Sequence, residues 1–402
     1  MTIASFILDN KWVLLAYLIL AIIIYLNRKK FIVENKVFLL YKTKHGVDYI
    51  HKVADKNKEF IKILGYIAIG IGFVGMVIIA GFFIKGLYDL FFVPSAPATV
   101  SLVIPGIQIP GSPIKIPFVY GILALFVVIL FHEFGHGVVA RANGIKIKST
   151  GIGILGPLPL AFVEPDEKQV TKASSHVQHS IFAAGPFFNI LLCVVVYVVI
   201  ALIGMLIVSM VTPQGVYFSE IQKGYAAETY GVEANVTYNM LNGIQINTSS
   251  DLADRLSCLK PNDTVVIAND DKKITMIASQ KNDSAKGYLG VAGVKTKYKL
   301  KSESPFYKTV FDALLLLTNP FAQGFAEYTF LQWIFTLSLG IGLANLLPLG
   351  PVDGGRMLNT ALIDIKGKEK GTKLWAQISW LTLAVMLILL LVPIFKAIVL
   401  KV

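Results

Sequence analysis

The sequence predicts a polytopic α-helical membrane protein with about six transmembrane helices, short membrane-associated β segments and one inserted α+β domain. Hydrophobic residues make up 55% of the 402 positions and charged residues 15%, and the mean hydropathy is +0.65. Ordinary soluble domains carry about 25% charged residues, so this composition is typical of a chain that crosses a bilayer several times. Long uncharged runs alternate with basic clusters, and the window 212–298 has the composition of a soluble domain.

The N-terminal region, 1–118, is expected to hold two spans, at 12–26 and 63–84. The segment between them, 27–62, carries ten lysines and arginines against four acidic residues. The positive-inside rule therefore places it in the cytoplasm and the N-terminus outside. The first run has no small-residue cleavage site, which favours an anchor helix over a removed signal peptide. The net charge of +12 favours contact with the anionic lipid bilayer over a nucleic-acid partner.

Proline, glycine and β-branched residues dominate 85–118, and either a hairpin of short strands or an ordinary external loop fits this composition. The next region, 119–211, is expected to begin with an inward-running helix at 119–143. It continues with a glycine- and proline-rich stretch, 151–165, which is too broken for a helix. Because non-helical backbone near a membrane needs polar partners, we expect this stretch to be strand-like and folded against the functional site. A further span is predicted at 181–210.

The window 212–300 is predicted to be a separate domain of short strands and turns on the extracytoplasmic side. The order of inward and outward spans gives this orientation, and four N-x-[ST] sequons within the window support it; they begin at Asn235, Asn247, Asn262 and Asn282. The last region, 301–402, re-enters the membrane through apolar runs at 313–317 and 328–347. A lysine-rich loop follows, and 375–395 is the final predicted span.

The motif H-E-F-G-H at 132–136 lies inside the apolar helix predicted at 119–143. His132 and His136 share one helical face and are about 6 Å apart in rise. Two imidazoles at this spacing can hold one zinc ion, and Glu133 between them can take a proton from a water molecule. An ionisable residue at bilayer depth costs roughly 2.5–3.5 kcal/mol on insertion scales, so three of them within five positions indicate a function.

A catalytic zinc ion takes three protein ligands, so the two histidines need a partner from elsewhere in the chain. Asp353 is a candidate, because prolines and a glycine pair break the helix around it. The alternative is that Asp353 caps a helix at the cytoplasmic boundary. Glu164 is the other candidate for the third ligand. His176 and His179 are expected to be surface residues.

Two asparagines lie in apolar surroundings, Asn189 in a G-P-x-x-N element and Asn345 in an N-x-x-P element. An amide at this depth needs hydrogen-bonding partners, so packing between helices is one interpretation. The other interpretation is that either amide contacts a peptide backbone or steadies a tetrahedral oxyanion.

The order of these motifs, H-E-x-x-H, then G-P-x-x-N, then N-x-x-P leading to D-G at 353–354, resembles that of the site-2 proteases. These are intramembrane zinc metalloproteases. The resemblance covers roughly 119–210 and 305–400. The E-P-D-E sequence at 164–167, which follows A-F-V, is similar to the archaeal and eukaryotic branch of that family.

The resemblance implies that His132, His136 and Asp353 bind one Zn²⁺ per chain and that Glu133 is the general base. It further implies that Asn189 and Asn345 contact the substrate or the transition state, and that 151–163 pairs with unwound substrate as an edge strand. The expected protein is a zinc metalloendopeptidase that cleaves single-span membrane proteins within or near the bilayer. Its active site is expected towards the cytoplasmic side.

The extracytoplasmic domain resembles the PDZ domains found in this family. The passage 241–252 matches their strand-turn-helix passage, and 287–291 matches their closing strand. The usual Pro-Gly-Asp before that passage is replaced by A-N-V at 234–236, so a size gate or a substrate-docking module is the expected role.

Two other classes of protein also fit parts of the sequence. One is a membrane scaffold whose PDZ-like domain binds partners, and the other is a transporter in which broken helices such as 345–355 coordinate an ion. A transporter of that kind pairs broken segments between two halves, and the sequence shows no such pairing. The sequence indicates no particular oligomeric state.

Overall fold

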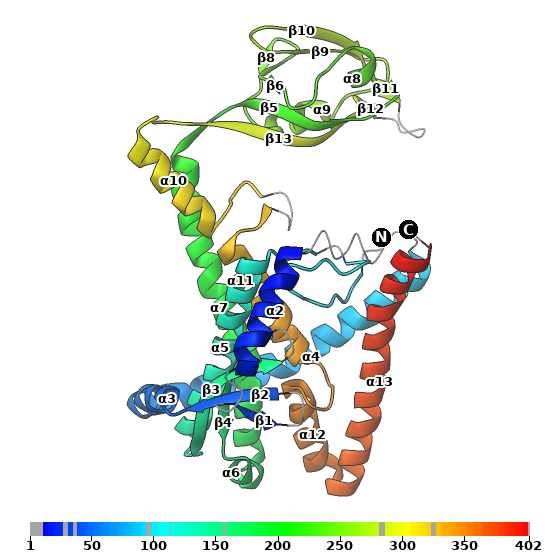
Figure 1. The fold of residues 1–402 in the computed structure, drawn as a ribbon. Coiled ribbons are helices and arrows are strands. Elements are labelled where there is room, and N and C mark those ends of the chain that lie inside the picture. The colour runs from blue at the N-terminus through cyan, green and yellow to red at the C-terminus, as the bar shows by residue number, and fades with distance from the viewer. Residues whose placement is uncertain are drawn as a thin grey trace. The chain divides into compact units, whose positions relative to one another are not determined.

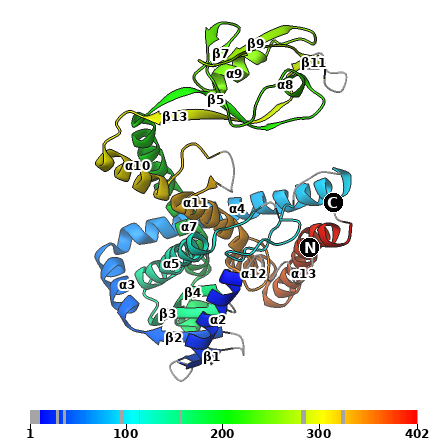
Figure 2. The same ribbon diagram turned by 45° about the horizontal axis from the view of Figure 1, so that its top comes forward.

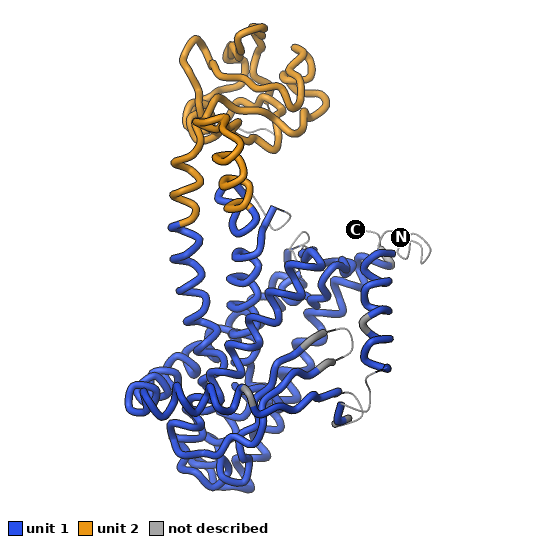
Figure 3. The backbone as a smooth tube through the Cα atoms, turned by 60° about the vertical axis from the view of Figure 1, so that its left-hand side comes forward, with its two compact units in different colours: residues 1–202, 316–402 blue, residues 203–315 orange. Residues whose placement is uncertain are grey.

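A computed structural model gives the structure of residues 11–26, 31–34, 38–93, 98–112, 114–155, 158–280, 286–322 and 327–400. The chain divides into two compact units (Figure 3). The first comprises Met1–Leu202 and Leu316–Val402, and the second comprises Ile203–Leu315.

Among the described residues, four helices are long and apolar enough to cross a membrane (Figure 1). They are α4 (Lys58–Phe92), α5 (Phe118–Ala142), α7 (Ser175–Ser209) and α13 (Lys368–Phe395), the last continued by the π-helical turn η3 (Lys396–Leu400). Two further apolar helices, α2 (Lys11–Leu26) and α11 (Phe330–Asn345), have 16 residues each. The structure therefore confirms a multi-helix membrane fold, whereas the predicted six spans are matched by four helices of spanning length.

Helix α4 extends eight residues beyond the predicted 63–84 span, up to Phe92. No proline or turn cluster interrupts 85–92, and Pro94 follows shortly afterwards in the sequence, where a helix normally ends. The described part of 98–117 is irregular and has one isolated bridge, between Ile104 and Ile107. Of the two alternatives for this region, the loop is the better description.

The glycine-rich stretch after α5 forms two strands of a four-stranded antiparallel sheet with the order β1-β2-β3-β4 (Figure 1). The strands are β1 (Ile32–Glu34), β2 (Phe38–Thr43), β3 (Ile147–Leu155) and β4 (Leu158–Pro165). A Cβ at Gly151 would lie 2.1 Å from the carbonyl oxygen of Tyr41, so only glycine allows β3 to approach β2 this closely. The strand-like segment predicted at 151–165 is confirmed, and its further partner strands come from the basic N-terminal segment. The expectation that 151–163 is one edge strand was wrong in part, because β3 lies between β2 and β4 and, of these two strands of the segment, only β4 is at an end of the sheet.

Helix α3 (His45–Lys56) holds the N-terminal segment against α5. Val47, Ile50 and Ala54 are buried in the core that contains the C-terminal half of α5. Arg141 donates from Nε and Nη2 to the two carboxylate oxygens of Asp55, at 2.9 and 2.8 Å. This hydrogen-bonded pairing lowers the pKa of Asp55. The start of the sheet is thus anchored beside the H-E-x-x-H helix.

The polar stretch before the span at 181–210 is already helical, because α6 (Glu167–Lys172) is followed directly by α7 from Ser175. His176 is exposed, as predicted. The prediction that His179 lies on the surface was wrong. Its side chain is buried, and its ring lies edge-on to Phe73 of α4, with 5.4 Å between the ring centroids. His176 and His179 lie three residues apart on the face of α7 that meets α4, beside Tyr66 and Phe73 respectively, but only His179 is covered by this packing.

Helices α5, α7 and α11 pack together around Val128, Leu192 and Trp333 (Figure 2). The chain then breaks after Asn345 and restarts as α12 (Asp353–Lys366). Gly354 and Gly355 allow this restart, since their Cβ atoms would lie 2.3 Å from the carbonyl oxygen of Leu346 and 1.9 Å from that of Leu349. The break thus places the first residue of α12 beside α5.

The second unit is an α+β fold with its own core, which includes Phe218, Tyr238 and Leu252. One sheet has the order β13-β5-β6, a second has the order β10-β9-β7-β8, and β11 and β12 form a two-stranded sheet. The first sheet contains β5 (Val211–Ile221), β6 (Thr237–Tyr238) and β13 (Val291–Leu300). The second contains β7 (Met240–Leu241), β8 (Ile244–Gln245), β9 (Thr264–Ala268) and β10 (Lys273–Ile277). The remaining elements are α8 (Ala226–Thr229), α9 (Ser249–Leu256), β11 (Ser279–Gln280), β12 (Gly287–Tyr288) and the first part of α10 (Pro305–Leu317).

Two local signals shape the strand-turn-helix passage of this unit. Asn242 and Gly243 join β7 to β8 with φ values of 49° and 78°, which an Asn-Gly hairpin turn requires. Thr248 then caps α9, because its side chain accepts the N–H of Asp251 while the Asp251 carboxylate accepts the N–H of Thr248. The passage at 241–252 therefore follows from local turn and capping chemistry.

Candidate metal centre

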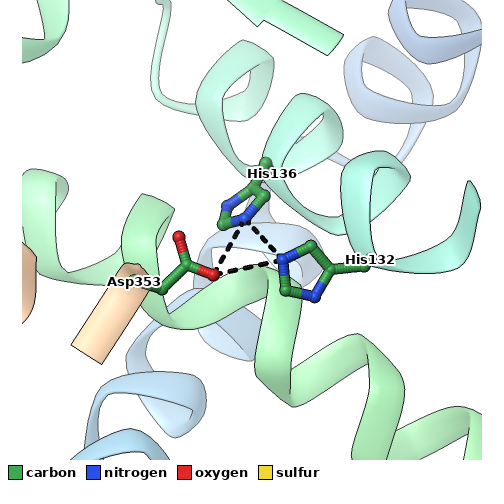
Figure 4. A group of neighbouring side chains, drawn as sticks. All are labelled: His132, His136 and Asp353. Atoms are coloured by element: carbon green, nitrogen blue, oxygen red, sulfur yellow. Dashed lines mark hydrogen bonds and ion pairs between the residues drawn. The ribbon is translucent and has the colours of Figure 1, made fainter. Parts of the chain in front are cut away.

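Three side chains from two helices meet at one buried point (Figure 4). His132 and His136 lie one turn apart on α5, and Asp353 is the first residue of α12. The Nε2 atoms of the two histidines are 3.2 Å apart. The Oδ2 atom of Asp353 is 3.1 Å from Nε2 of His132 and 3.3 Å from Nε2 of His136. The predicted spacing on one helical face and the predicted third residue thus come together in space.

The donor set and its spacing fit a tetrahedral metal ion. Ligand atoms bound at about 2.0–2.2 Å to such an ion lie roughly 3.3–3.6 Å from each other, close to the separations in this cluster. Oδ2 of Asp353 is buried and has no hydrogen-bond partner among the described residues, although both imidazoles lie nearby. A buried carboxylate oxygen that faces two imidazole nitrogens is well placed to bind a cation. The three residues could therefore hold one metal ion.

His136 is held in the form that a metal ligand needs. Its Nδ1 atom lies 2.7 Å from the carbonyl oxygen of Ile181 on α7. A carbonyl can only accept, so Nδ1 carries the proton and the Nε2 lone pair points into the cluster. This backbone contact is the usual way in which a second shell orients a metal-binding imidazole.

Gly185 leaves the space that the cluster needs. A Cβ at this position would lie 2.4 Å from Nε2 of His136 and 2.6 Å from Nε2 of His132. No side chain other than hydrogen fits there, and this explains the glycine of the G-P-x-x-N element. Pro186 follows inside α7 and removes one backbone donor next to the centre.

Glu133 lies beside the cluster and is tied to the sheet. Its Oε2 atom accepts the backbone N–H of Val163 on β4 at 3.0 Å. Because this N–H points to Glu133, the edge of β4 opposite to β3 faces the metal centre. The strand-like segment is therefore folded against the site, as the sequence predicted.

A cavity of about 300 Å³ opens beside the cluster. Glu133 and Asn345 line it together with the three clustered residues. The side-chain Nδ2 of Asn345 donates to the carbonyl oxygen of Ile341 at 3.0 Å, within its own helix. Asn189 does not line this cavity; it is fully buried, and its amide faces Nδ1 of His132 at 3.2 Å. Of the two predicted asparagines, Asn345 thus lines the cavity and Asn189 is buried against His132.

Glu164 is not part of the cluster. Its carboxylate accepts hydrogen bonds from Nζ of Lys42 at 2.7 Å and from Oγ of Ser149 at 2.5 Å. These hydrogen bonds, from the lysine first and the serine second, lower the pKa of Glu164. Of the two candidates for a third ligand, Asp353 is the one that faces the histidines. The capping alternative is not supported, because Val352 holds the N-cap position of α12 and no side-chain cap hydrogen bond is made there. Asp353 is the first residue of the helix, where the helix N-terminus stabilises its negative charge.

The structure adds an ion pair at the cavity that the sequence analysis missed. Nη2 of Arg356 donates to both carboxylate oxygens of Glu167, at 2.9 and 3.0 Å. The Arg356 guanidinium also lies 4.1 Å above the ring of Phe182. All three residues line the cavity. Arg356 lies three residues after Asp353, on the same side of α12, and this spacing was the signal available in the sequence.

Comparison with known proteins agrees with a metal centre at this position. The model of peptidase family M50 matches residues 120–390. An uncharacterised protein of Methanocaldococcus jannaschii is 27% identical over 357 residues, which cover 87% of this chain and 85% of that protein. A Campylobacter jejuni protein named "putative zinc metalloprotease" is 26% identical over 69% of this chain and 92% of its own length. A Clostridium acetobutylicum protein with the same name is 23% identical over 70% of this chain and 97% of its own length.

Proposed function

The chain belongs to peptidase family M50, and from this premise we propose that it is an intramembrane endopeptidase that cleaves single-span membrane proteins within or next to the bilayer. Its membership, the names of its relatives and the His-His-Asp cluster together make it a zinc metalloprotease. The observation that best supports cleavage within or next to the bilayer is the position of that cluster. Two of its three residues, His132 and His136, lie in α5, which is long and apolar enough to cross a membrane.

In this proposal His132, His136 and Asp353 hold the zinc ion, and Asn345 contacts the peptide in the cavity. Zinc in such a site acts as a Lewis acid towards a peptide carbonyl and towards water. Glu133 takes the proton of the attacking water and passes it to the leaving amine. The hydrogen bond from the backbone of Val163 holds the Glu133 carboxylate towards the cavity.

The open edge of β4 supports binding of an extended peptide. Peptide bonds in a membrane helix are already hydrogen-bonded, so a single-span substrate has to unwind before it is cleaved. An edge strand can supply the hydrogen bonds that the unwound segment has lost. Since Val163 of β4 contacts Glu133, a peptide added at this edge would pass directly beside the catalytic carboxylate.

We further propose the orientation that the charges indicate. The ten basic residues of 27–62 and the lysines of 366–373 face the cytoplasm, and the 203–315 unit is extracytoplasmic. This unit acts as a PDZ-like gate or docking module for substrates. The Asn-Gly hairpin and the capped helix α9 support this role, because they form the strand-turn-helix passage expected at 241–252.

The test uses purified full-length protein in lipid vesicles with single-span test proteins whose external portions have been trimmed. The intact protein should release fragments cut within or beside the span. Glu133→Gln should keep its zinc and release none, whereas the exposed Glu59→Gln should cleave normally. Cleavage that persists in Glu133→Gln, or cleavage confined to soluble proteins, would overturn the proposal and favour a scaffold or another peptidase specificity.

A further inference from the structure

Asn189 contacts a residue of the metal centre but does not line the cavity. It lies on α7 with no exposed surface, and its amide is 3.2 Å from Nδ1 of His132. The other nitrogen of that ring, Nε2, is the atom that faces Asp353 and His136. The two histidines are therefore each contacted at Nδ1 by a group from α7, His136 by a backbone carbonyl and His132 by an amide side chain.

The two contacts differ in how strictly they determine which nitrogen of the imidazole ring carries the proton. The carbonyl of Ile181 accepts only, so it fixes the proton of His136 on Nδ1. An asparagine amide can either donate through Nδ2 or accept through Oδ1. In the structure Nδ2 faces His132, and Oδ1 is buried without a hydrogen-bond partner among the described residues. In that arrangement Nδ1 of His132 accepts the amide N–H, so the ring carries its own proton on Nε2, in the direction of Asp353. Nε2 then has no lone pair for a metal ion.

A half-turn of the amide exchanges Oδ1 and Nδ2 with almost no change of shape. Oδ1 then accepts Nδ1–H of His132, and the Nε2 lone pair points into the cluster, as it does in His136. We propose that Asn189 is a positioning residue that holds His132 in its metal-binding tautomer by accepting Nδ1–H through Oδ1. This inference rests on the zinc site of the proposed function and replaces the substrate contact expected for Asn189.

The surroundings of Asn189 fit a fixed positioning role. Ser338 on α11 donates to the backbone carbonyl of Asn189 at 2.9 Å, and both residues are fully buried. A Cβ at Gly342 would lie 3.2 Å from Cβ of Asn189, so this glycine allows α11 to pack closely against the asparagine. Helix α11 thus holds the backbone and Cβ of Asn189, and the amide remains directed at His132.

The test measures zinc affinity in the purified full-length protein by competition with a graded series of chelators, so that it does not depend on peptidase activity. Asn189→Leu keeps a similar shape but removes the acceptor, and it should weaken zinc binding by about 10–100-fold, the usual cost of losing a second-shell partner. Asn189→Asp keeps an acceptor and cannot donate, so it should bind zinc at least as tightly as the intact protein. Cys193→Ala is the matched control, because it removes another contact between α7 and α11, from Sγ of Cys193 to the carbonyl oxygen of Phe335, without touching Asn189 or His132, and its zinc affinity should be unchanged.

Asn189→Asp also decides the result if Asn189→Leu does not fold. A loss of affinity in Asn189→Asp would mean that Asn189 donates to His132, and the proposal would be wrong. Wild-type affinity in a folded Asn189→Leu, or an equal loss in Cys193→Ala, would reduce Asn189 to a packing residue. Failure of the proposed function is a separate result, since the intact protein would then bind no zinc at all.

Discussion

The carboxylates of Asp353 at the metal centre and of Asp251 in the 203–315 unit are satisfied in different ways. At the centre, Oδ2 of Asp353 and Oδ1 of Asn189 have no hydrogen-bond partner among the described residues. In the other unit, Asp251 accepts the N–H groups of Asn247 and Thr248, each at 2.9 Å, and completes a capping box. Oδ2 of Asp353 remains available to a cation, whereas the carboxylate of Asp251 is satisfied within its own unit. Changes at the centre should therefore alter zinc binding, and changes that destabilise the 203–315 unit should leave zinc binding unchanged.

The largest expected effect is that of Gly185→Ala. The added methyl group would lie within 2.6 Å of both Nε2 atoms and occupy the space between the ligands. We expect the purified variant to contain no zinc by elemental analysis. Gly340→Ala is the matched control, because a Cβ at that position in α11 meets nothing within 4 Å. Zinc retained at the wild-type level in Gly185→Ala would contradict this description of the site.

Leu252→Ala should destabilise the 203–315 unit and leave the zinc content unchanged. Leu252 is buried in the core of the 203–315 unit, and its truncation should lower the opening free energy of that unit by about 2–5 kcal/mol. Hydrogen exchange of the full-length protein would measure this loss, and the zinc content should stay unchanged. The exposed Ile244→Ala in the same unit should have an effect within about 0.5 kcal/mol. Loss of zinc in Leu252→Ala would show that the centre depends on the folding of this unit.

Thr248→Ala should cause a smaller loss in the same unit. It removes the side-chain oxygen that accepts the N–H of Asp251 at the start of α9. The expected cost is about 0.5–2 kcal/mol, confined to amides of α9 and its neighbours in a hydrogen-exchange experiment. Ser250→Ala, at an exposed position of the same helix, is the control. Equal effects in the two variants would mean that the capping box contributes nothing.

The smallest effect is the pH dependence that Asp251 gives to this unit. Hydrogen bonds from the backbone N–H groups of Asn247 and then Thr248 lower the pKa of Asp251. A carboxyl with a lowered folded pKa stabilises the fold above its unfolded value of about 3.9, and the contribution disappears as the pH falls through the folded pKa. The stability difference between the intact protein and Asp251→Asn should therefore be constant above about pH 5 and shrink below about pH 4. The exposed Ser250→Ala, which leaves the Asp251 carboxylate in place, should keep the pH dependence of the intact protein.

Much of the membrane fold could be predicted from the sequence, because its signals are local. Hydropathy located the four helices of spanning length, and the H-E-x-x-H spacing placed His132 and His136 on one face. Glycine and proline content excluded a helix at 151–165. The choice of Asp353 as the third ligand depended on the resemblance of the ordered motifs to those of a known family. More than 200 residues of sequence separate Asp353 from the histidines that it meets, so no local signal connects them.

The remaining features depend on contacts between distant segments. The pairing of β2 with β3 joins residues more than 100 positions apart, and nothing local in 38–43 indicates it. The burial of His179 depends on which face of α7 meets α4. The contact of Asn189 with His132 likewise depends on how α7 packs against α5. A sequence pattern shows that such a polar residue needs a partner, but only the packing shows which partner it has.

The most direct test of the central claim is the zinc content of the purified protein measured beside His136→Ala, Asp353→Ala and Glu164→Ala. Glu164 is the matched control, because it is a nearby carboxylate that pairs with Lys42 and not with the histidines. We expect about one zinc ion per chain in the intact protein and in Glu164→Ala, as a single three-ligand site requires, and none in the other two variants. Zinc retained in Asp353→Ala, or lost in Glu164→Ala, would contradict the assignment of the site.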